Sequence, residues 1–190
     1  PISSYGFQKL SVEYFAKAAN LQYGLEYSIA RPFNCVGIGE VKATSSDQNS
    51  KKLTLSHVVP DLILKTLNSE DSIEILGNGN QIRHYTYGED LAEGIVLLLD
   101  HPNAKNEDFN LSTSESTNVL ELAELIWKKL KPDKDFKYDS VDPYEYDVQK
   151  RIPSTEKAKK MLGFEAKTSL DKMLDIVIPW IKDAYAKGYY

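Results

Sequence analysis

Residues 4–34 read SYGFQKLSVEYFAKAANLQYGLEYSIARPFN, and this stretch predicts a helix followed by a strand. Within residues 8–20 the apolar side chains recur at the three- and four-residue spacing of an amphipathic helix. Gly24 stands just past that pattern, where glycine commonly ends a helix. Residues 25–31 then alternate in the manner of a strand. Pro32 ends this strand because proline cannot donate to a ladder.

The same alternation of helix and strand continues along the chain and predicts an α/β fold. Residues 34–56 predict a long loop with a binding segment at its start. Residues 77–79 (GNG) read as a hairpin turn between two strands. We expect helices over 58–67, 89–99, 119–130, 154–162 and 169–187, and strands over 72–76, 81–87, 108–112 and 136–141.

The composition is that of a globular protein, because 42% of the 190 residues are apolar and 27% are charged. The 23 basic and 28 acidic residues give a formal net charge of −5, which argues against a broad basic face for nucleic acid. A few arginines or lysines in a cleft can still hold a small anion. We expect no membrane partner, since no apolar run approaches the ~18 residues of a spanning helix.

Cys35 is the only cysteine of the sequence. A single cysteine excludes a disulfide framework and a cysteine-rich zinc site, so we expect no metal. It also suits a reducing compartment, and we therefore expect a cytoplasmic protein. We expect the Cys35 thiol to be packed, because no histidine partner is apparent that would activate it as a nucleophile.

Tyr5 and Lys9 are four residues apart at the start of the first predicted helix, so they lie on one face, one turn apart. A lysine ammonium at that distance favours the phenolate form of tyrosine, which makes the phenol usable as a general acid or base on a hydroxyl. The ammonium also supplies three donors that can hold ribose hydroxyls. The same spacing is also common in ordinary surface pairs of helices, and the motif alone does not separate the two interpretations.

Six motifs follow one another along the chain. They are SYGFQK at 4–9, RPFN at 31–34, ILGNGNQIRHY at 75–85, YGEDLA at 87–92, FNLS at 109–112 and KAKKMLGF at 157–164. This ordered set resembles the extended short-chain dehydrogenase/reductases, and within them the NAD-dependent nucleotide-sugar epimerase/dehydratase family. The resemblance covers essentially all 190 residues. It implies part of a doubly wound, Rossmann-like parallel sheet together with a small α/β substrate-binding lobe.

The resemblance implies catalytic and cofactor-binding roles for three residues. Tyr5 would be the catalytic acid/base, which removes a proton from a sugar hydroxyl while hydride passes to NAD, or to NADP in its place. Lys9 would bind the nicotinamide ribose and tune Tyr5. Pro32 would touch the nicotinamide carboxamide through the backbone.

The resemblance also implies a nucleotide-sugar substrate. Arg83 matches the arginine that binds the diphosphate, and guanidinium suits this task because its fork binds phosphate oxygens bidentately. The helix start at 57–58 would meet the phosphates. The strand at 74–76 would pair with the base through its backbone, and residues 150–151 would form a second basic position. The implied substrate-binding residues are Asn34, His57, Val58, Glu74, Leu76, Arg83, Lys150 and Arg151.

Two positions depart from the family pattern. His84 stands where the family usually has an aspartate after the arginine, so the local hydrogen-bond network must differ. Tyr144 stands where some epimerases carry a further phosphate-binding arginine. The nucleotide and the sugar therefore do not carry over from any one member of the family.

The glycine loop, the acidic ribose-binding residue and the serine or threonine of the family's catalytic triad do not precede Tyr5. We therefore expect the chain to be the C-terminal portion of a longer enzyme and, as given, to bind NAD weakly and to be inactive by itself. We expect residues 1–33 and 89–112 to belong to the cofactor-binding core and residues 34–88 and 113–190 to the substrate-binding lobe. We also expect a homodimer.

Two alternatives stay open on the sequence. The chain can be a non-catalytic module that binds sugar nucleotides or mediates dimerisation. It can also belong to a nucleotide-sugar decarboxylase or reductase, which the motifs do not separate from an epimerase or dehydratase.

Overall fold

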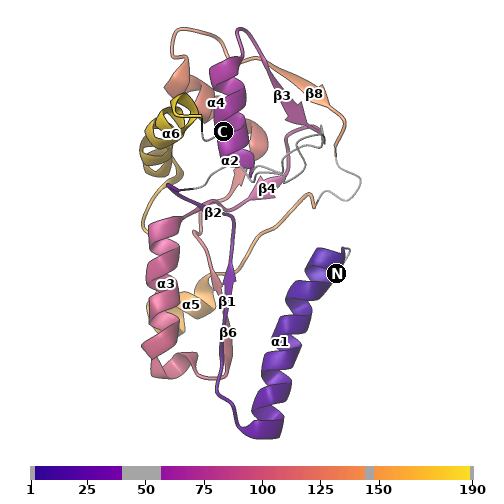
Figure 1. Ribbon diagram of the computed structural model, residues 1–190, viewed down its shortest axis with the longest axis vertical. Helices are drawn as coiled ribbons and strands as arrows, with labels where there is room; N and C mark the ends of the chain where they lie inside the picture. The colour runs from indigo at the N-terminus through magenta and orange to yellow at the C-terminus, as the bar shows by residue number, and fades with distance from the viewer. Residues whose placement is uncertain (1–2, 40–56, 144–147, 189–190) are drawn as a thin grey trace.

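The computed structural model describes residues 3–39, 57–143 and 148–188 (Figure 1). Most of the loop expected over 34–56, and Tyr144, lie outside these residues. The elements are α1 (Ser4–Tyr23), β1 (Ser28–Pro32), β2 (Cys35–Val36), α2 (Val58–Asn68), β3 (Ile73–Leu76), β4 (Ile82–Arg83), β5 (Thr86–Tyr87), α3 (Gly88–Asp100), the 3-10 turn η1 (Pro102–Ala104), β6 (Glu107–Leu111), β7 (Thr117–Asn118), α4 (Val119–Leu130), β8 (Tyr138–Val141), α5 (Glu156–Leu162) and α6 (Leu170–Ala186).

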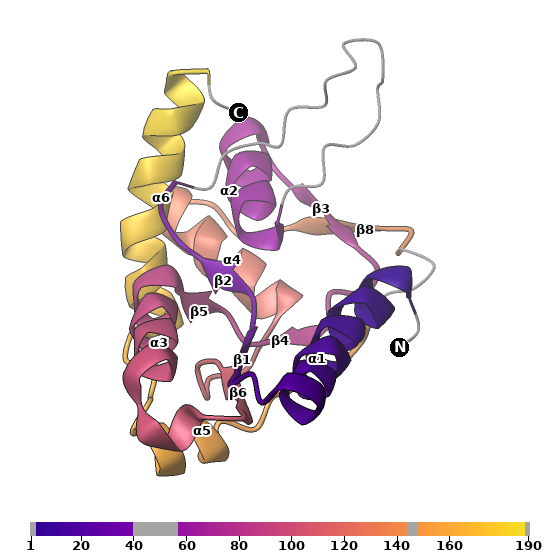
Figure 2. The same cartoon turned by 60° about the horizontal axis from the view of Figure 1, so that its bottom comes forward.

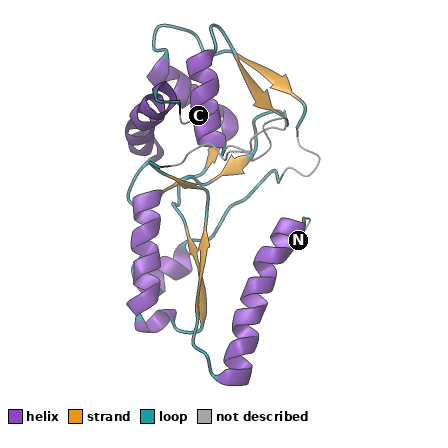
Figure 3. Ribbon diagram, in the orientation of Figure 1, coloured by secondary structure: helices purple, strands orange, loops and turns teal. Residues whose placement is uncertain are grey.

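The described strands form four pairs, of which three are parallel and one is antiparallel (Figure 3). β1 pairs in parallel with β6, in the register Ser28 to Glu107 through Pro32 to Leu111. β2 pairs in parallel with β5, and β3 pairs in parallel with β8. β4 runs antiparallel to β7. Parallel strands joined through helices confirm the α/β class predicted from the sequence.

The hairpin expected around residues 77–79 is wrong. The single strand expected over 81–87 is divided into β4 and β5, and neither of them pairs with β3. Gly77 and Gly79 do have positive φ angles and do turn the chain. However, β3 takes its partner from β8, some sixty residues further on, so the turn leads to a different pairing. A local turn signal cannot report such a distant partner.

Two hydrophobic cores hold the described part of the molecule together. The larger one gathers side chains of α2, β3, α4 and α6 around Trp127, which is completely buried. The smaller one packs α3 and α5 against β6 around Phe109. In Figure 1 these cores correspond to the upper and the lower part of the molecule, and the β2 and β4 strands lie where the two parts meet.

The helix α1 runs beside the β1–β6 pair and contributes no buried side chain (Figure 2). Ser3 caps its start by accepting a hydrogen bond from the Gly6 N–H at 3.1 Å, and Gly24 ends it in the left-handed conformation. Its apolar side chains are exposed instead, among them Phe7, Val12, Tyr14, Phe15 and Leu21. Among the described residues, no helix has the length and apolar character needed to cross a bilayer.

Candidate functional site

A pocket of about 170 Å³ lies where the start of α2 faces β3 and the strand segment that follows it. Val58 contributes from the first turn of α2, Glu74 and Leu76 from β3, and Arg83 from β4. The structure therefore brings together four of the residues singled out in the sequence, which come from α2, β3 and β4. The pocket is lined mainly by apolar atoms, and Leu62 and Val119 complete its walls.

Four further polar residues line the same pocket, and the sequence interpretation did not include them. They are Asp61, Lys65, Gln81 and Tyr85. A signal for Tyr85 was present, since a residue two positions after Arg83 lies on the same side of an extended segment. No comparable signal marked Lys65, because its approach to β3 depends on how α2 packs.

Tyr85 is 3% exposed, and its hydroxyl has no hydrogen-bond partner among the described residues. Burial raises the pKa of this phenol to about 12, although the nearby charge of Arg83 acts in the opposite direction. Tyr85 therefore stays protonated at neutral pH, and its hydroxyl hydrogen is not donated to any of the described residues. A buried hydroxyl without a partner costs free energy, so a polar ligand group that accepted its hydrogen would gain a good partner.

Residues 149–151 run along the free edge of β4. The Ile82 N–H donates to the Gln149 carbonyl at 2.8 Å, and the Arg151 N–H donates to the Ile82 carbonyl at 3.2 Å. Lys150 stands opposite Ile82 in an isolated parallel bridge. Lys150 and Arg151 are far from Arg83 in the sequence. Backbone hydrogen bonds to Ile82 hold their segment beside the β4 strand that carries Arg83. Arg83 itself is half-buried, whereas Lys150 and Arg151 are exposed.

His84 is buried, and its side chain and backbone both form hydrogen bonds with neighbouring segments. Its Nδ1 lies 2.9 Å from the Thr113 carbonyl oxygen, which can only accept, so Nδ1 carries the proton. The Asn34 side chain donates through Nδ2 to the His84 carbonyl at 3.0 Å. The Asn34 carbonyl in turn accepts from the Thr86 N–H at 3.1 Å. Asn34, with a φ of +35°, is thereby fixed against the β4–β5 segment.

His57 and Val58 start the same helix but face different hollows. Val58 lines the pocket described above, while His57 lines an open hollow together with Cys35, Tyr87 and Glu89. Cys35 is exposed, so the expectation of a packed thiol is wrong. The side chain lies on a two-residue strand whose neighbour Val36 takes the buried position.

Tyr5 and Lys9 lie together on the first turns of α1. The Lys9 ammonium nitrogen is 5.4 Å from the centroid of the Tyr5 ring, and the Tyr5 side chain is 64% exposed. Neither residue lines the pocket at α2 and β3. Pro32 is also exposed, at the end of β1 and opposite Leu111.

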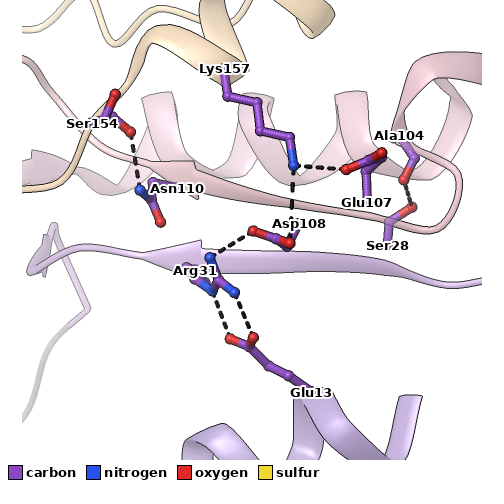
Figure 4. Close-up of polar contacts among 9 residues, drawn as sticks. All are labelled: Glu13, Ser28, Arg31, Ala104, Glu107, Asp108, Asn110, Ser154 and Lys157. Carbon is purple, nitrogen blue, oxygen red and sulfur yellow. Dashed lines mark hydrogen bonds and ion pairs between the residues drawn. The ribbon is translucent and has the colours of Figure 1, made fainter. Parts of the chain in front are cut away.

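A polar network ties α1 to the sheet (Figure 4). Arg31 on β1 donates from Nε to Glu13 Oε1 at 2.7 Å and from a terminal nitrogen to Glu13 Oε2 at 2.5 Å. Its other terminal nitrogen reaches Asp108 on β6 at 2.6 Å. The hydrogen bonds that Arg31 donates to Glu13 lower the pKa of the Glu13 carboxyl and raise the pKa of Arg31. Glu13 stands one turn beyond Lys9, so this contact orients the face that carries Tyr5 and Lys9.

Known proteins resemble the chain over nearly its whole length. It is 31% identical over 170 residues to UDP-glucuronic acid decarboxylase 1 of Arabidopsis thaliana, which covers 88% of this chain and 35% of that protein. It is 28% identical over 206 residues to the UDP-glucose 4-epimerase of Halalkalibacterium halodurans, covering 100% of this chain and 57% of that protein. The chain thus spans about half the length, or less, of these relatives.

Two solved structures are also similar to the chain over nearly its whole length. A UDP-glucose 4-epimerase from Thermotoga maritima, solved with UDP-glucose, is 30% identical with a TM-score of 0.79, over 97% of this chain and 55% of that one. A UDP-glucuronic acid 4-epimerase from Bacillus cereus, solved with UDP-glucuronic acid and NAD, has a TM-score of 0.82 at 22% identity, over 97% of this chain and 54% of that one. This second likeness concerns the fold alone, which is a partial Rossmann-like α/β fold.

The sequence profile of the NAD dependent epimerase/dehydratase family matches residues 1–112, which is more than half of the chain. The match includes the α1 helix with Tyr5 and Lys9 and most residues of the α2–β3 pocket. The chain therefore belongs to the NAD-dependent epimerase/dehydratase family.

Proposed function

We propose that the protein containing this chain is an NAD-dependent epimerase or dehydratase that acts on the sugar of a nucleotide-sugar. The observation that carries the proposal is the pocket that Glu74, Leu76, Arg83 and Tyr85 line together. Such a pocket offers a strand edge, a guanidinium and a hydroxyl donor within one apolar enclosure. These are the groups that a nucleoside diphosphate requires.

The substrate would enter with its base against β3 and its diphosphate toward Arg83. The Arg83 guanidinium would bind phosphate oxygens, and Tyr85 would donate its hydroxyl hydrogen to one of them. Lys150 and Arg151 would add positive charge from the edge of β4. The N–H groups at the start of α2, near His57 and Val58, would favour the same negative charge. Asn34 would contact the substrate from the opposite side of the β4–β5 segment.

The cofactor site would be formed at α1 and the end of β1. Lys9 would donate to the ribose hydroxyls, and Pro32 would contact the carboxamide through its backbone. Bound NAD supplies a two-electron oxidant for the sugar carbon. Tyr5 would accept the proton of the sugar hydroxyl, and Lys9 would stabilise the negative charge of its phenolate form.

The decisive variant is Tyr5→Phe in the protein at its full natural length. We expect turnover of UDP-sugars to fall by about 10²–10⁴-fold, because the general acid/base is lost while the ring remains. Tyr14→Phe is the matched control, since Tyr14 is an equally exposed tyrosine of the same helix (68%, against 64% for Tyr5). Product analysis and circular dichroism would be measured on both variants. Undiminished turnover in Tyr5→Phe would remove Tyr5 from the mechanism.

A nucleotide-sugar decarboxylase is the second candidate, because the Arabidopsis decarboxylase is as similar to this chain as the epimerases are. The binding and proton-transfer residues would be shared, so only the products distinguish the reactions. UDP-glucuronic acid as substrate would release CO₂ from a decarboxylase and would be isomerised by an epimerase. A homodimer and a substrate-binding lobe made of residues 34–88 and 113–190 remain part of the proposal.

A further inference from the structure

One edge of β3 is open toward the α2–β3 pocket. The Ile73 N–H donates to the Lys137 carbonyl at 3.2 Å, and the Gly77 N–H donates to the Val141 carbonyl at 2.8 Å. These bonds place the backbone groups of the odd-numbered residues on the β8 side. Because backbone groups alternate along a strand, those of Glu74 and Leu76 point the other way, toward α2 and the pocket.

Both carbonyl groups on this open edge already accept a hydrogen bond. The Lys65 ammonium donates to the Glu74 carbonyl at 3.2 Å, and the Gln81 side-chain amide donates to the Leu76 carbonyl at 3.1 Å. The N–H groups of Glu74 and Leu76 have no partner among the described residues. The open edge therefore presents two N–H donors beside two carbonyl oxygens that each keep one lone pair.

Lys65 adds to this donor character. Its ammonium forms an ion pair with Asp61, one turn earlier on α2, at 2.9 Å. This contact and the bond to Glu74 use two of its three N–H donors, and the third is left for a ligand. Both Asp61 and Lys65 line the pocket. The salt bridge thus holds the ammonium at the pocket wall instead of letting it extend into solvent.

We propose that Lys65 makes this pocket selective for a base that carries a carbonyl oxygen on the edge facing β3, as uracil, thymine and guanine do. The inference rests on the proposed function, in which the pocket receives the base of a nucleotide-sugar. A carbonyl oxygen would accept from the free N–H of Leu76 or from Lys65. The amino group of cytosine or adenine at the same position would instead place N–H donors against the donors of Leu76 and Lys65. Such a site disfavours the mismatched base because the base loses this hydrogen bond and sets donor against donor.

The test compares UDP with CDP, which differ at the base edge and share the ribose and the diphosphate. Isothermal titration calorimetry on the protein at full natural length would give both dissociation constants for the wild type and for Lys65→Met. We expect UDP to bind at least about tenfold more tightly than CDP in the wild type. In Lys65→Met we expect this ratio to fall to about threefold or less, through weaker UDP binding and unchanged or tighter CDP binding.

Lys128→Met is the matched control. Lys128 forms an ion pair with Glu124 at 2.8 Å in the same i,i+4 arrangement, but on α4 and outside the pocket. This variant should keep the wild-type ratio. Lys65→Arg, which retains the positive charge and its donors, should keep most of the selectivity. If Lys65→Met does not fold by circular dichroism, Lys65→Leu, which also removes the donors, takes its place with the same expected loss.

The outcomes separate the inference from the function on which it rests. An unchanged UDP-to-CDP ratio in folded Lys65→Met, with UDP binding still abolished by Arg83→Gln, would overturn the role of Lys65 and leave the proposed function standing. Equal binding of UDP and CDP by the wild type would also overturn the role of Lys65 and leave the proposed function standing. A folded wild-type protein that binds none of UDP, CDP, GDP and ADP would overturn the proposed function itself.

Discussion

Arg31 is the residue through which the described structure holds the α1 helix in place. Its guanidinium contacts Glu13 of α1 and Asp108 of β6 at the same time, and Lys157 extends the network by an ion pair with Glu107 at 2.7 Å (Figure 4). Because α1 has no buried side chain, this bidentate contact fixes the direction of the face with Tyr5 and Lys9 more than packing does. Nothing in the sequence marked Arg31 for this role, since its partners are 18 and 77 residues away.

The Glu13–Arg31 contact should make part of the stability depend on acid pH. The pKa of Glu13 is lowered below its ordinary value of 4.5, so its contribution is complete above that pH and is lost as the pH falls through the lower, folded-state pKa. We expect Glu13→Gln to reduce the free energy of unfolding by about 1 kcal/mol at pH 7. The difference from the wild type should shrink toward zero below pH 4.5.

Urea unfolding between pH 3 and pH 7 would measure this difference. Glu26→Gln is the control, because Glu26 forms an exposed ion pair with Lys105 and should contribute little at either pH. If the difference in the free energy of unfolding between the wild type and Glu13→Gln stayed constant down to pH 3, the contact would not depend on the ionised carboxylate.

Part of the candidate site could be predicted from the sequence, because several of its residues occupy positions that match the family pattern. Val58, Glu74, Leu76 and Arg83 were named from the family resemblance, and the structure places them in one pocket. Tyr85 and Lys65 were missed. The burial of Tyr85 and the approach of Lys65 to the Glu74 carbonyl both depend on the packing of α2 against β3, which no local pattern encodes.

At the level of elements, local signals placed the helices well. The α4 helix begins at Val119 as predicted, because Asn118 and Glu121 form a reciprocal capping box with bonds of 2.8 and 3.0 Å. The α5 helix ends at Leu162 as predicted, and Gly163 follows it in the left-handed conformation. The short strands β2 and β7 were missed, since two residues give no measurable alternation.

Gly79 connects the turn after β3 to the start of α4. Its φ is +70°, and an added Cβ would lie 2.5 Å from Cγ of Leu120, whose N–H donates to the Gly79 carbonyl at 3.1 Å. We expect Gly79→Ala to lower the free energy of unfolding by about 2–4 kcal/mol, from the left-handed backbone and the steric clash together. Thermal or urea unfolding would measure the loss.

Gly163→Ala separates the cost of the left-handed backbone from the cost of the steric clash. Gly163 has nearly the same φ, +68°, but an added Cβ would meet nothing within 4 Å. This variant should lose only about 1 kcal/mol, which is the cost of the left-handed backbone alone. Equal losses in the two variants would mean that Leu120 moves aside without cost, and that the turn and α4 are not tightly packed.

For the whole molecule, the main unusual feature is the uncovered α1 helix. Phe7, Leu10, Tyr14 and Phe15 line a shallow groove along it, and all of these side chains are exposed. An apolar surface of this kind tends to associate in water. The chain spans about half the length of the epimerases it resembles, so further protein sequence is present in those relatives.

We therefore expect the 190-residue chain, produced by itself, to associate beyond a monomer at micromolar concentration. Phe15→Asp should shift sedimentation velocity profiles toward the monomer, because it places a charge in the groove. Lys17→Gln is the control, since it changes the net charge by the same single unit outside the groove. A monomeric wild-type chain, or an equal shift in both variants, would contradict a role for this groove.

The sequence by itself determined the α/β class, the positions of the helices, the family resemblance and four residues of the pocket. These follow from local periodicity, caps and motifs, which act between residues close in the chain. Only the tertiary structure decided that β3 pairs with β8, that Arg31 holds α1, and that Lys65 and Tyr85 line the pocket. Each of these depends on contacts between distant segments, whose free energy is gained only when the whole chain packs.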